Sequence, residues 1–348
     1  MRNLIKTCLL AALFSGSICA VVIAGPFEDG MAAYDRNDYS TAVRLWGPLA
    51  DKGNANAGYF LGAMYENGHG VPQNNTEAMK WYRKAADHGD ARAQTMVGSK
   101  YEEGRGVTQN YSEAAEWFRK AADHGYTPAQ YLLGLYYQNG QGLPQSYVEA
   151  AKWYRKAAVD NSDAQSNLGQ MYNNGQGVQK NYAEAVQWFR KAADQGNAIA
   201  QFNLGLQYYQ GKGIPLNFAE AAQWFRKAAN QGNPNGQLQL GTMYYQGKGV
   251  AQNYKEALKL FRDAANQGTE KAHAMLGLMY LNGEGVPQDN VRAYMWESLA
   301  TALTSSAKYR EATSQARDLV AKNMTPAQIE RAQTMARTCQ QSNFKLCD

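Results

Sequence analysis

The chain has 348 residues, of which 45% are hydrophobic and 19% charged, and its formal net charge is +5. This mild balance, without a stripe of Lys and Arg interleaved with aromatic residues, argues against binding to nucleic acid. A chain of this length usually forms about two or three globular domains, but a regular internal repeat points to another organisation.

The first residues of the chain have the pattern of a secretory signal. Two basic residues precede an apolar run from Cys8 to Ile23, and small residues near its end suit cleavage after Ala20 or Ala24. The run is shorter than the ~20 residues that a membrane span needs. We therefore expect residues 1–24 to be removed, and the mature protein to be secreted or periplasmic with no stable insertion in a membrane.

A block that reads L-G-x-x-Y-x-x-G, with small variations, recurs along the rest of the chain at steps of 35 or 36 residues. Its first Gly falls at Gly62, Gly98, Gly134, Gly169, Gly205, Gly241 and Gly277. A second marker keeps the same step: Trp81, Trp117, Trp153, Trp188, Trp224, Leu260 and Trp296. Self-similarity at this period indicates a solenoid, in which each unit packs only on its neighbours.

Each repeat is predicted to begin with a helix that has one apolar face. In the unit at 57–89, Ala57, Leu61 and Met64 follow the helical spacing i, i+4, i+7. Gly68 comes after them and suits the left-handed position that ends a helix. The Gly inside each first helix costs about 1 kcal/mol relative to Ala, so we expect it to let the paired helix approach closely.

A second helix follows in each repeat. Asn74 and Glu77 form a capping box at its start, and Trp81 is expected to fill the space between layers. The same box recurs at Asn110/Glu113, Ser146/Glu149, Asn181/Glu184, Asn217/Glu220 and Asn253/Glu256. The pattern therefore predicts an all-α fold of paired helices.

This pattern resembles the Sel1-like repeat family, a relative of the tetratricopeptide repeats. The family pattern A-x-x-x-L-G-x-x-Y-x-x-G-x-G-V, followed by an N-cap and A-x-x-W-[FY]-x-K-A-A-x-x-G, matches residues 57–89 almost without a gap. The resemblance implies an α-solenoid of helix-turn-helix repeats that forms a right-handed superhelix. The departures are Asn161 in place of the terminal Gly of the third repeat, Gly236 in place of Ala, and Leu260 in place of Trp.

The predicted organisation has four parts. They are a signal peptide at 1–24, a partial N-terminal repeat at 25–54, seven Sel1-like repeats at 55–302, and a C-terminal helical cap at 303–348. The last repeat and the cap depart most from the pattern, as terminal units do when their outer face meets water. A partner-binding role for the cap is the alternative.

The cap is expected to hold a polar amphipathic helix over about 303–322 and a last helix from Thr325 to about Arg337. After signal removal, Cys339 and Cys347 are the remaining cysteines. Two cysteines this close in an oxidising compartment are expected to form a disulfide. The pair offers too few ligands for a metal site, so neither a metal nor a cofactor is predicted.

No motif predicts a catalytic residue. Ser305-Ser306-Ala307-Lys308 matches the S-x-x-K form of penicillin-handling serine enzymes, but the partner motifs K-T-G and S-D-N are missing. His88 and His124 recur one repeat apart, too far to share a metal, and are interpreted as polar surface near a helix end. His69 and His273 are isolated in the sequence.

Partner binding is predicted on the variable positions of the first helices. By resemblance to the tetratricopeptide arrangement, these helices line the concave face, and one row at i, i+4, i+7 would point into it. The predicted partner-binding residues of this row are Tyr59, Glu66, Glu102, Tyr131, Gln138, Gln170, Asn173, Phe202, Tyr209 and Tyr245. Their amide and aromatic groups suit a peptide or a protein helix, and a glycan stays possible.

Two alternatives to this row remain open. Some of its apolar members, such as Leu135, Leu206 and Leu238, could belong to the core between repeats. The adjacent row, instead, could face the partner: Phe60, Met96, Lys100, Asn167 and Gln207.

The sequence thus favours an exported, non-enzymatic, monomeric scaffold or adaptor that binds another protein in the cell envelope or in a host. The alternatives are a peptidoglycan- or glycan-binding module and a β-lactamase-like envelope enzyme.

Overall fold

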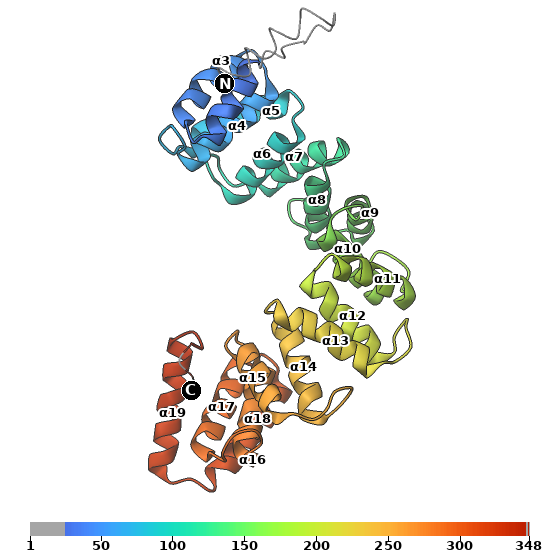
Figure 1. The fold of residues 1–348 in the computed structure, drawn as a ribbon, viewed down its shortest axis with the longest axis vertical. Helices are drawn as coiled ribbons and strands as arrows, with labels where there is room; N and C mark the ends of the chain where they lie inside the picture. Colours follow the sequence, from blue (N-terminus) through green and yellow to red (C-terminus); the bar gives the residue numbers. More distant parts are fainter. Residues whose placement is uncertain (1–24, 346, 348) are drawn as a thin grey trace, which may run out of the picture. The chain divides into compact units, whose positions relative to one another are not determined.

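A computed structural model describes residues 25–345 and Cys347 of this chain. Within these residues it contains eighteen helices, α2 to α19, and no strand (Figure 1). The predicted solenoid of helix-turn-helix repeats is therefore confirmed. The predicted signal peptide, residues 1–24, lies outside the described residues.

The helices fall into two compact units. The first extends to Gln145 and contains α2 (Pro26–Asp35), α3 (Tyr39–Asp51), α4 (Ala55–Asn67), α5 (Asn75–Asp87), α6 (Ala91–Glu103), α7 (Tyr111–Asp123) and α8 (Thr127–Asn139). The second begins at Ser146 and contains α9 (Tyr147–Ala157), α10 (Ser162–Asn174), α11 (Tyr182–Asp194), α12 (Ala198–Gln210), α13 (Phe218–Asn230), α14 (Pro234–Gln246), α15 (Tyr254–Ala265), α16 (Glu270–Asn282), α17 (Asn290–Leu303), α18 (Ala307–Ala321) and α19 (Pro326–Gln341).

The connector inside each repeat is held by backbone geometry. The first helix ends at a Gly in the left-handed region, such as Gly68 with φ 71°. Asn74 then caps α5, because its side chain accepts from the backbone N–H of Thr76 and of Glu77. The backbone N–H of Asn74 donates to the carbonyl of Tyr65, 2.8 Å away, at the end of the first helix.

This last bond corrects the predicted capping boxes. In a capping box, the Glu side chain accepts from the N-cap backbone N–H, but here a carbonyl of the preceding helix takes that donor. The same bond joins Asn110 to Tyr101, Asn181 to Tyr172, Asn217 to Tyr208 and Asn253 to Tyr244. A complete capping box does form at Thr325 and Gln328, where α19 begins.

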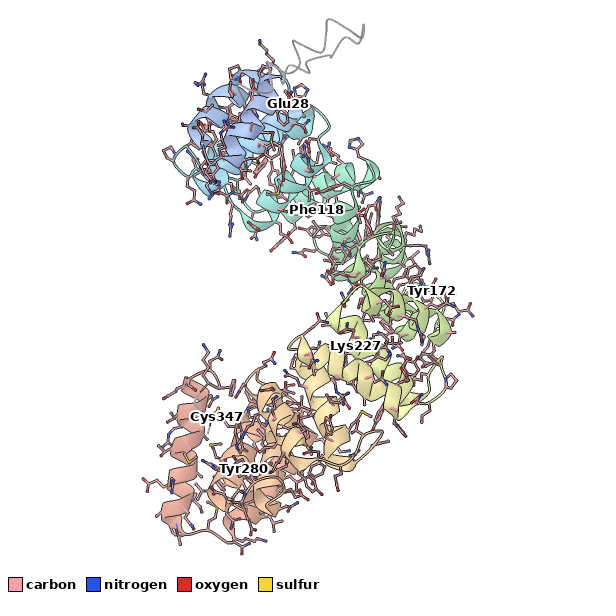
Figure 2. The ribbon with its side chains drawn as sticks, in the orientation of Figure 1. Glu28, Phe118, Tyr172, Lys227, Tyr280 and Cys347 are labelled. Atoms are coloured by element: carbon pink, nitrogen blue, oxygen red, sulfur yellow. A yellow bond between two sulfur atoms is a disulfide. The ribbon has the colours of Figure 1, made fainter. Side chains whose placement is uncertain are left out.

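In five repeats the Gly inside the first helix faces an aromatic ring of the paired second helix. A Cβ placed on Gly62 would lie 2.5 Å from Cδ1 of Tyr82, and one on Gly205 would lie 2.7 Å from Cδ1 of Phe225. Phe118 of α7 has the same position and is fully buried (Figure 2). The residue after each Trp, rather than the Trp itself, therefore requires the Gly.

Two of the three departures from the repeat pattern have a clear structural basis. Asn161 does not replace the terminal Gly of the third repeat. It has φ −103° and is the N-cap of α10, accepting from the backbone N–H of Ala164 at 2.7 Å. The third repeat lacks the Gly altogether, and α9 is correspondingly short, with 11 residues. Gly236 lets α13 approach, since a Cβ there would lie 2.8 Å from that of Ala228.

The cap packs its two helices, α18 and α19, on α17 (Figure 1). Cys339 and Cys347 are buried in the same cluster as Val320 and Ala332, and their sulfur atoms are bonded. His273 of α16 is fully buried there too, between the rings of Trp296 and Phe344, and its Nδ1 lies 2.8 Å from the Thr269 carbonyl.

A buried carboxyl group replaces an aromatic ring in the last repeat. Glu297 follows Trp296 and faces Gly277, where every earlier repeat has Tyr or Phe. It is 7% exposed, and its Oε2 has no hydrogen-bond partner among the described residues. Burial raises the pKa of Glu297 to about 7. The ionised form is therefore unfavourable in this core.

Substitution by Ala is expected to have opposite effects on stability at the two Gly positions of α4. Gly62→Ala is expected to lower the free energy of unfolding by about 1–3 kcal/mol, because the new methyl group overlaps the Tyr82 ring. Gly58→Ala is expected to raise it by about 0.5–1 kcal/mol. The new Cβ would lie 3.1 Å from that of Ala85, and later repeats accommodate the larger Gln or His at this position. Urea unfolding followed by circular dichroism compares them. Equal effects of the two changes would contradict the packing role of Gly62.

Glu297→Gln is expected to stabilise the protein at pH 8 and to have little effect below pH 5. A carboxyl group whose pKa is raised on folding contributes stability below its unfolded pKa and loses it as pH rises through about 7. The loss is on the order of 3 kcal/mol. Thermal unfolding of both proteins between pH 5 and pH 8 measures it. Burial lowers the pKa of His273, so protonation of His273 destabilises the protein at acid pH. A His273→Gln control removes this second contribution to the pH dependence. Parallel curves for wild type and Glu297→Gln would contradict the assignment.

Candidate functional site

Two hydrogen-bonded ladders fix the first helices from α6 to α16 against the preceding repeat. In one, the Arg of a second helix donates to the Tyr hydroxyl of the next first helix. The pairs are Arg119–Tyr137, Arg155–Tyr172, Arg190–Tyr208, Arg226–Tyr244 and Arg262–Tyr280. Tyr172 and Tyr280 are labelled in Figure 2. These bonds set the rotation of the first helices, which the sequence left undetermined.

The second ladder consists of amide side chains. Gln94, Gln130, Gln165 and Gln201 each donate to a carbonyl near the end of the preceding second helix. Gln195 of the next second helix then donates to Gln165 at 2.8 Å, and His124 has the equivalent place beside Gln94 at 3.2 Å. His124 is exposed, as predicted, but it also takes part in a contact between repeats.

In the first unit, the predicted partner-binding residues are engaged within the protein. Tyr59 packs on Tyr82 and lies beneath the Arg92 guanidinium, 4.5 Å from it. Glu66 accepts from the Tyr82 hydroxyl at 2.8 Å and forms an ion pair with Lys100. The remaining members are half-buried: Glu102, Tyr131 and Gln138.

The ion pair of Glu66 joins the predicted row to the competing one. Lys100, from the competing row, is only 1% exposed and reaches back one repeat to Glu66. Gln207, from the same competing row, is also buried and donates to Asn173 at 3.0 Å. These members of the two rows form one seam between successive first helices rather than two separate faces. Leu238 is buried as well, which agrees with the alternative that this residue belongs to the core between repeats.

In the second unit, two predicted residues near the C-terminal repeats also make hydrogen bonds within the protein. Tyr209 accepts from Lys248 Nζ at 3.2 Å and packs against Phe218. The Tyr245 hydroxyl donates to Glu284 at 2.7 Å, and burial together with this bond raises the pKa of Tyr245 to about 12. Both side chains therefore tie a first helix to the connector of the next repeat.

The other three predicted residues of the second unit, Gln170, Asn173 and Phe202, meet in a groove of about 460 Å³. This groove, called the amide groove below, runs over α10, α12 and the start of α14. Its lining contains no charged side chain and consists of Gln170, Asn173, Asn174, Phe189, Ile199, Phe202, Asn203, Asn233 and Asn235.

Sequence reasoning missed several members of the amide groove. Asn203 belongs to the position of the competing row, and Asn235 and Ile199 lie in the first turn of their helices. Their hydrophilic or variable character was visible, but the rotation of each helix was not. The signal that could have found them is the enrichment of Asn and Gln in the first helices of these three repeats.

The chemistry-bearing motifs do not form a site. Ser305 and Lys308 are both exposed at the start of α18. His69 stacks on Tyr39 with ring centroids 4.6 Å apart. In the part of the chain that the structure describes, no cluster of three His, Cys, Asp or Glu side chains is placed to hold a metal ion. No helix among these residues is both long and apolar enough to cross a membrane.

Glu66→Ala is expected to lower the free energy of unfolding by about 3 kcal/mol, because it leaves the Lys100 ammonium buried without its partner. Lys100→Met restores an apolar side chain of similar length, so the double variant is expected to recover most of this loss. Urea unfolding of the two single variants and the double variant gives the coupling. Additive effects would show that Glu66 is free for a partner.

Comparisons with known proteins agree with this architecture. A family model described as the Sel1 repeat matches residues 55–90, 91–126, 127–158, 162–197, 198–233, 234–269 and 270–304. The interruption after residue 158 falls where the third repeat lacks its Gly. Among curated proteins, no significant match was found.

Two solved structures are similar to this chain. A Sel1 repeat protein from Oxalobacter formigenes is 31% identical with a TM-score of 0.65, and the match covers 68% of this chain and 98% of the other. A protective antigen present in uropathogenic Escherichia coli strains, which displays an SLR fold, is 26% identical with a TM-score of 0.56 and 92% coverage of both chains. Sel1 repeat proteins generally mediate protein–protein interactions, and their fold is typically a non-catalytic scaffold. The seven repeats matched in this chain show that it belongs to the Sel1 repeat family.

Proposed function

We propose that this protein is an exported, non-enzymatic scaffold that holds another protein in the amide groove. The observation that carries the proposal is the groove itself. It spans three successive first helices, α10, α12 and α14, and offers amide groups beside the exposed side chain of Ile199. Hydrogen-bonding groups around an apolar contact are what a protein partner requires.

The chemistry of the groove favours binding over catalysis. Its lining holds amide and apolar groups, and it has no carboxylate, imidazole, thiol or hydroxyl group to act as acid, base or nucleophile. The Ser305 and Lys308 side chains belong to the cap, and neither lines this groove. A β-lactam-hydrolysing activity therefore has no support from the groove.

Export is supported by two features of the chain. Residues 1–24 have a basic start, an apolar run and small residues before Gly25. Cys339 and Cys347 are bonded and lie in the core of the cap, and such pairs persist in oxidising compartments. The similar protein from uropathogenic Escherichia coli is a protective antigen, which agrees with a role in the cell envelope or in contact with a host.

Immobilised mature protein is expected to capture a partner from the envelope fraction of its source organism. Gln170→Arg together with Asn203→Arg should abolish capture, since both fill the amide groove with bulk and charge. Gln187→Arg with Gln223→Arg is the matched control, because these amides are exposed on the second helices α11 and α13. Mass spectrometry of the eluates compares the three proteins.

Two results would contradict the proposal. One is a partner that both Arg variants retain equally, which would place binding elsewhere. The other is turnover of a chromogenic β-lactam by the wild-type protein that Ser305→Ala abolishes, which would make the protein an enzyme.

The natural protein in the envelope fraction is expected to begin after Ala20 or Ala24.

A further inference from the structure

Three amide side chains of the groove make no hydrogen bond within the part of the protein that the structure describes. They are Gln170 of α10, Asn203 of α12 and Asn235 of α14, one on each of three successive first helices. Other amides at the helix contacts are paired, as Gln207 is with Asn173 at 3.0 Å. The three side chains are therefore available to a ligand.

The three amides lie on an oblique line across the helices. The residue equivalent to Gln170 in the next repeat is Leu206, three positions after Asn203. The residue equivalent to Asn203 is Gln239, four positions after Asn235. Each step therefore moves back by about one helical turn, or about 5 Å. The first helices α10 and α12 contact each other through Gln207 and Asn173, and we take successive first helices to lie about 10 Å apart.

These two displacements place consecutive amides about 11 Å apart. An extended chain rises about 3.3 Å per residue, so about three residues of such a chain cover one step. The whole line corresponds to about seven residues. An extended segment laid along it would bring a backbone amide group near each of the three side chains in turn.

The chemistry of the line also matches a peptide backbone. An amide side chain both donates and accepts, and every residue of a peptide offers one N–H and one C=O. Ile199 is 52% exposed and can contact an apolar side chain of the segment. Phe189 is buried, and the half-buried Phe202 packs on Phe225 with ring centroids 5.8 Å apart, so Phe202 is the one ring of the groove that a sugar could stack on.

We propose that the amide groove binds an extended, uncharged peptide segment of about seven residues, and that Gln170, Asn203 and Asn235 hydrogen-bond its backbone. This inference rests on the proposed function and specifies that the partner presents an extended peptide segment. A charged segment would lose the hydration of its ionic groups without gaining a counter-charge, since none of the lining side chains is charged.

Selection of a phage-displayed library of random seven-residue peptides on the mature chain tests this proposal. Uncharged sequences are expected to be enriched. Isothermal titration calorimetry then measures the dissociation constant of a recovered peptide, synthesised with both ends capped. Gln170→Ala, Asn203→Ala and Asn235→Ala are each expected to weaken binding about fivefold. Gln187→Ala and Gln223→Ala are the controls and should leave the constant unchanged.

A second set of peptides separates backbone recognition from side-chain recognition. N-methylation of the peptide, one residue at a time, is expected to weaken binding at about every third residue, where a backbone N–H is lost. Peptides that tolerate every N-methylation would overturn the proposal, as would selection of charged sequences, the absence of any binder, or equal affinity for the groove and control variants.

Murein-derived oligosaccharides titrated in parallel provide the remaining outcome. Binding of these sugars that depends on Gln170 and Asn203 would assign the groove to a glycan and overturn the peptide proposal. If envelope capture depends on the groove while no peptide binds, the partner presents a folded surface. The scaffold function would then stand, and the extended peptide would be rejected.

Discussion

The contact between a glycine and an aromatic ring is the constraint on which the repeats before the last one depend. With no side chain on Gly62, the ring of Tyr82 lies directly against the backbone of α4. This brings the two helices of a repeat close enough for the Asn74 N–H to reach the Tyr65 carbonyl. The connector is then short, and its ends are fixed. The Arg–Tyr and amide ladders recur because the helix pairing is closely similar from one repeat to the next.

Much of this fold is readable from the sequence because its signals are local. Gly68 and Asn74 mark a helix end and a helix start through their own backbone preferences, and these recur in phase. What the sequence did not reveal depends on contacts about one repeat apart. Lys100 is a surface residue by its chemistry, yet it is buried against Glu66. In the sequence, Asn161 aligns with the Gly of other repeats. The structure shows that this Gly is deleted and that Asn161 is the N-cap of α10.

The candidate site was predicted in part for the same reason. The row from Tyr59 to Tyr245 was selected by helical periodicity, which gives a face but not its rotation. Gln170 and Phe202 reach the amide groove, and Asn173 both lines it and accepts from Gln207 of the next repeat. Glu66, Tyr209 and Tyr245 instead join repeats without lining the groove. Identical positions in different repeats thus have different roles. Which role applies depends on the residue opposite, one repeat away, and no local pattern reports that.

The ladders also bear on how such an array changes its length during evolution. Each Arg–Tyr bond joins residues 17 or 18 positions apart, so it links a repeat only to its neighbour. Duplicating or excising one whole unit would rejoin equivalent partners, and every bond could form again. A gain or loss of one residue inside a helix would instead rotate the rest of that helix by about 100° and disrupt its contacts with the neighbouring helices. The missing Gly of the third repeat lies in a turn between helices, where such a change is absorbed locally.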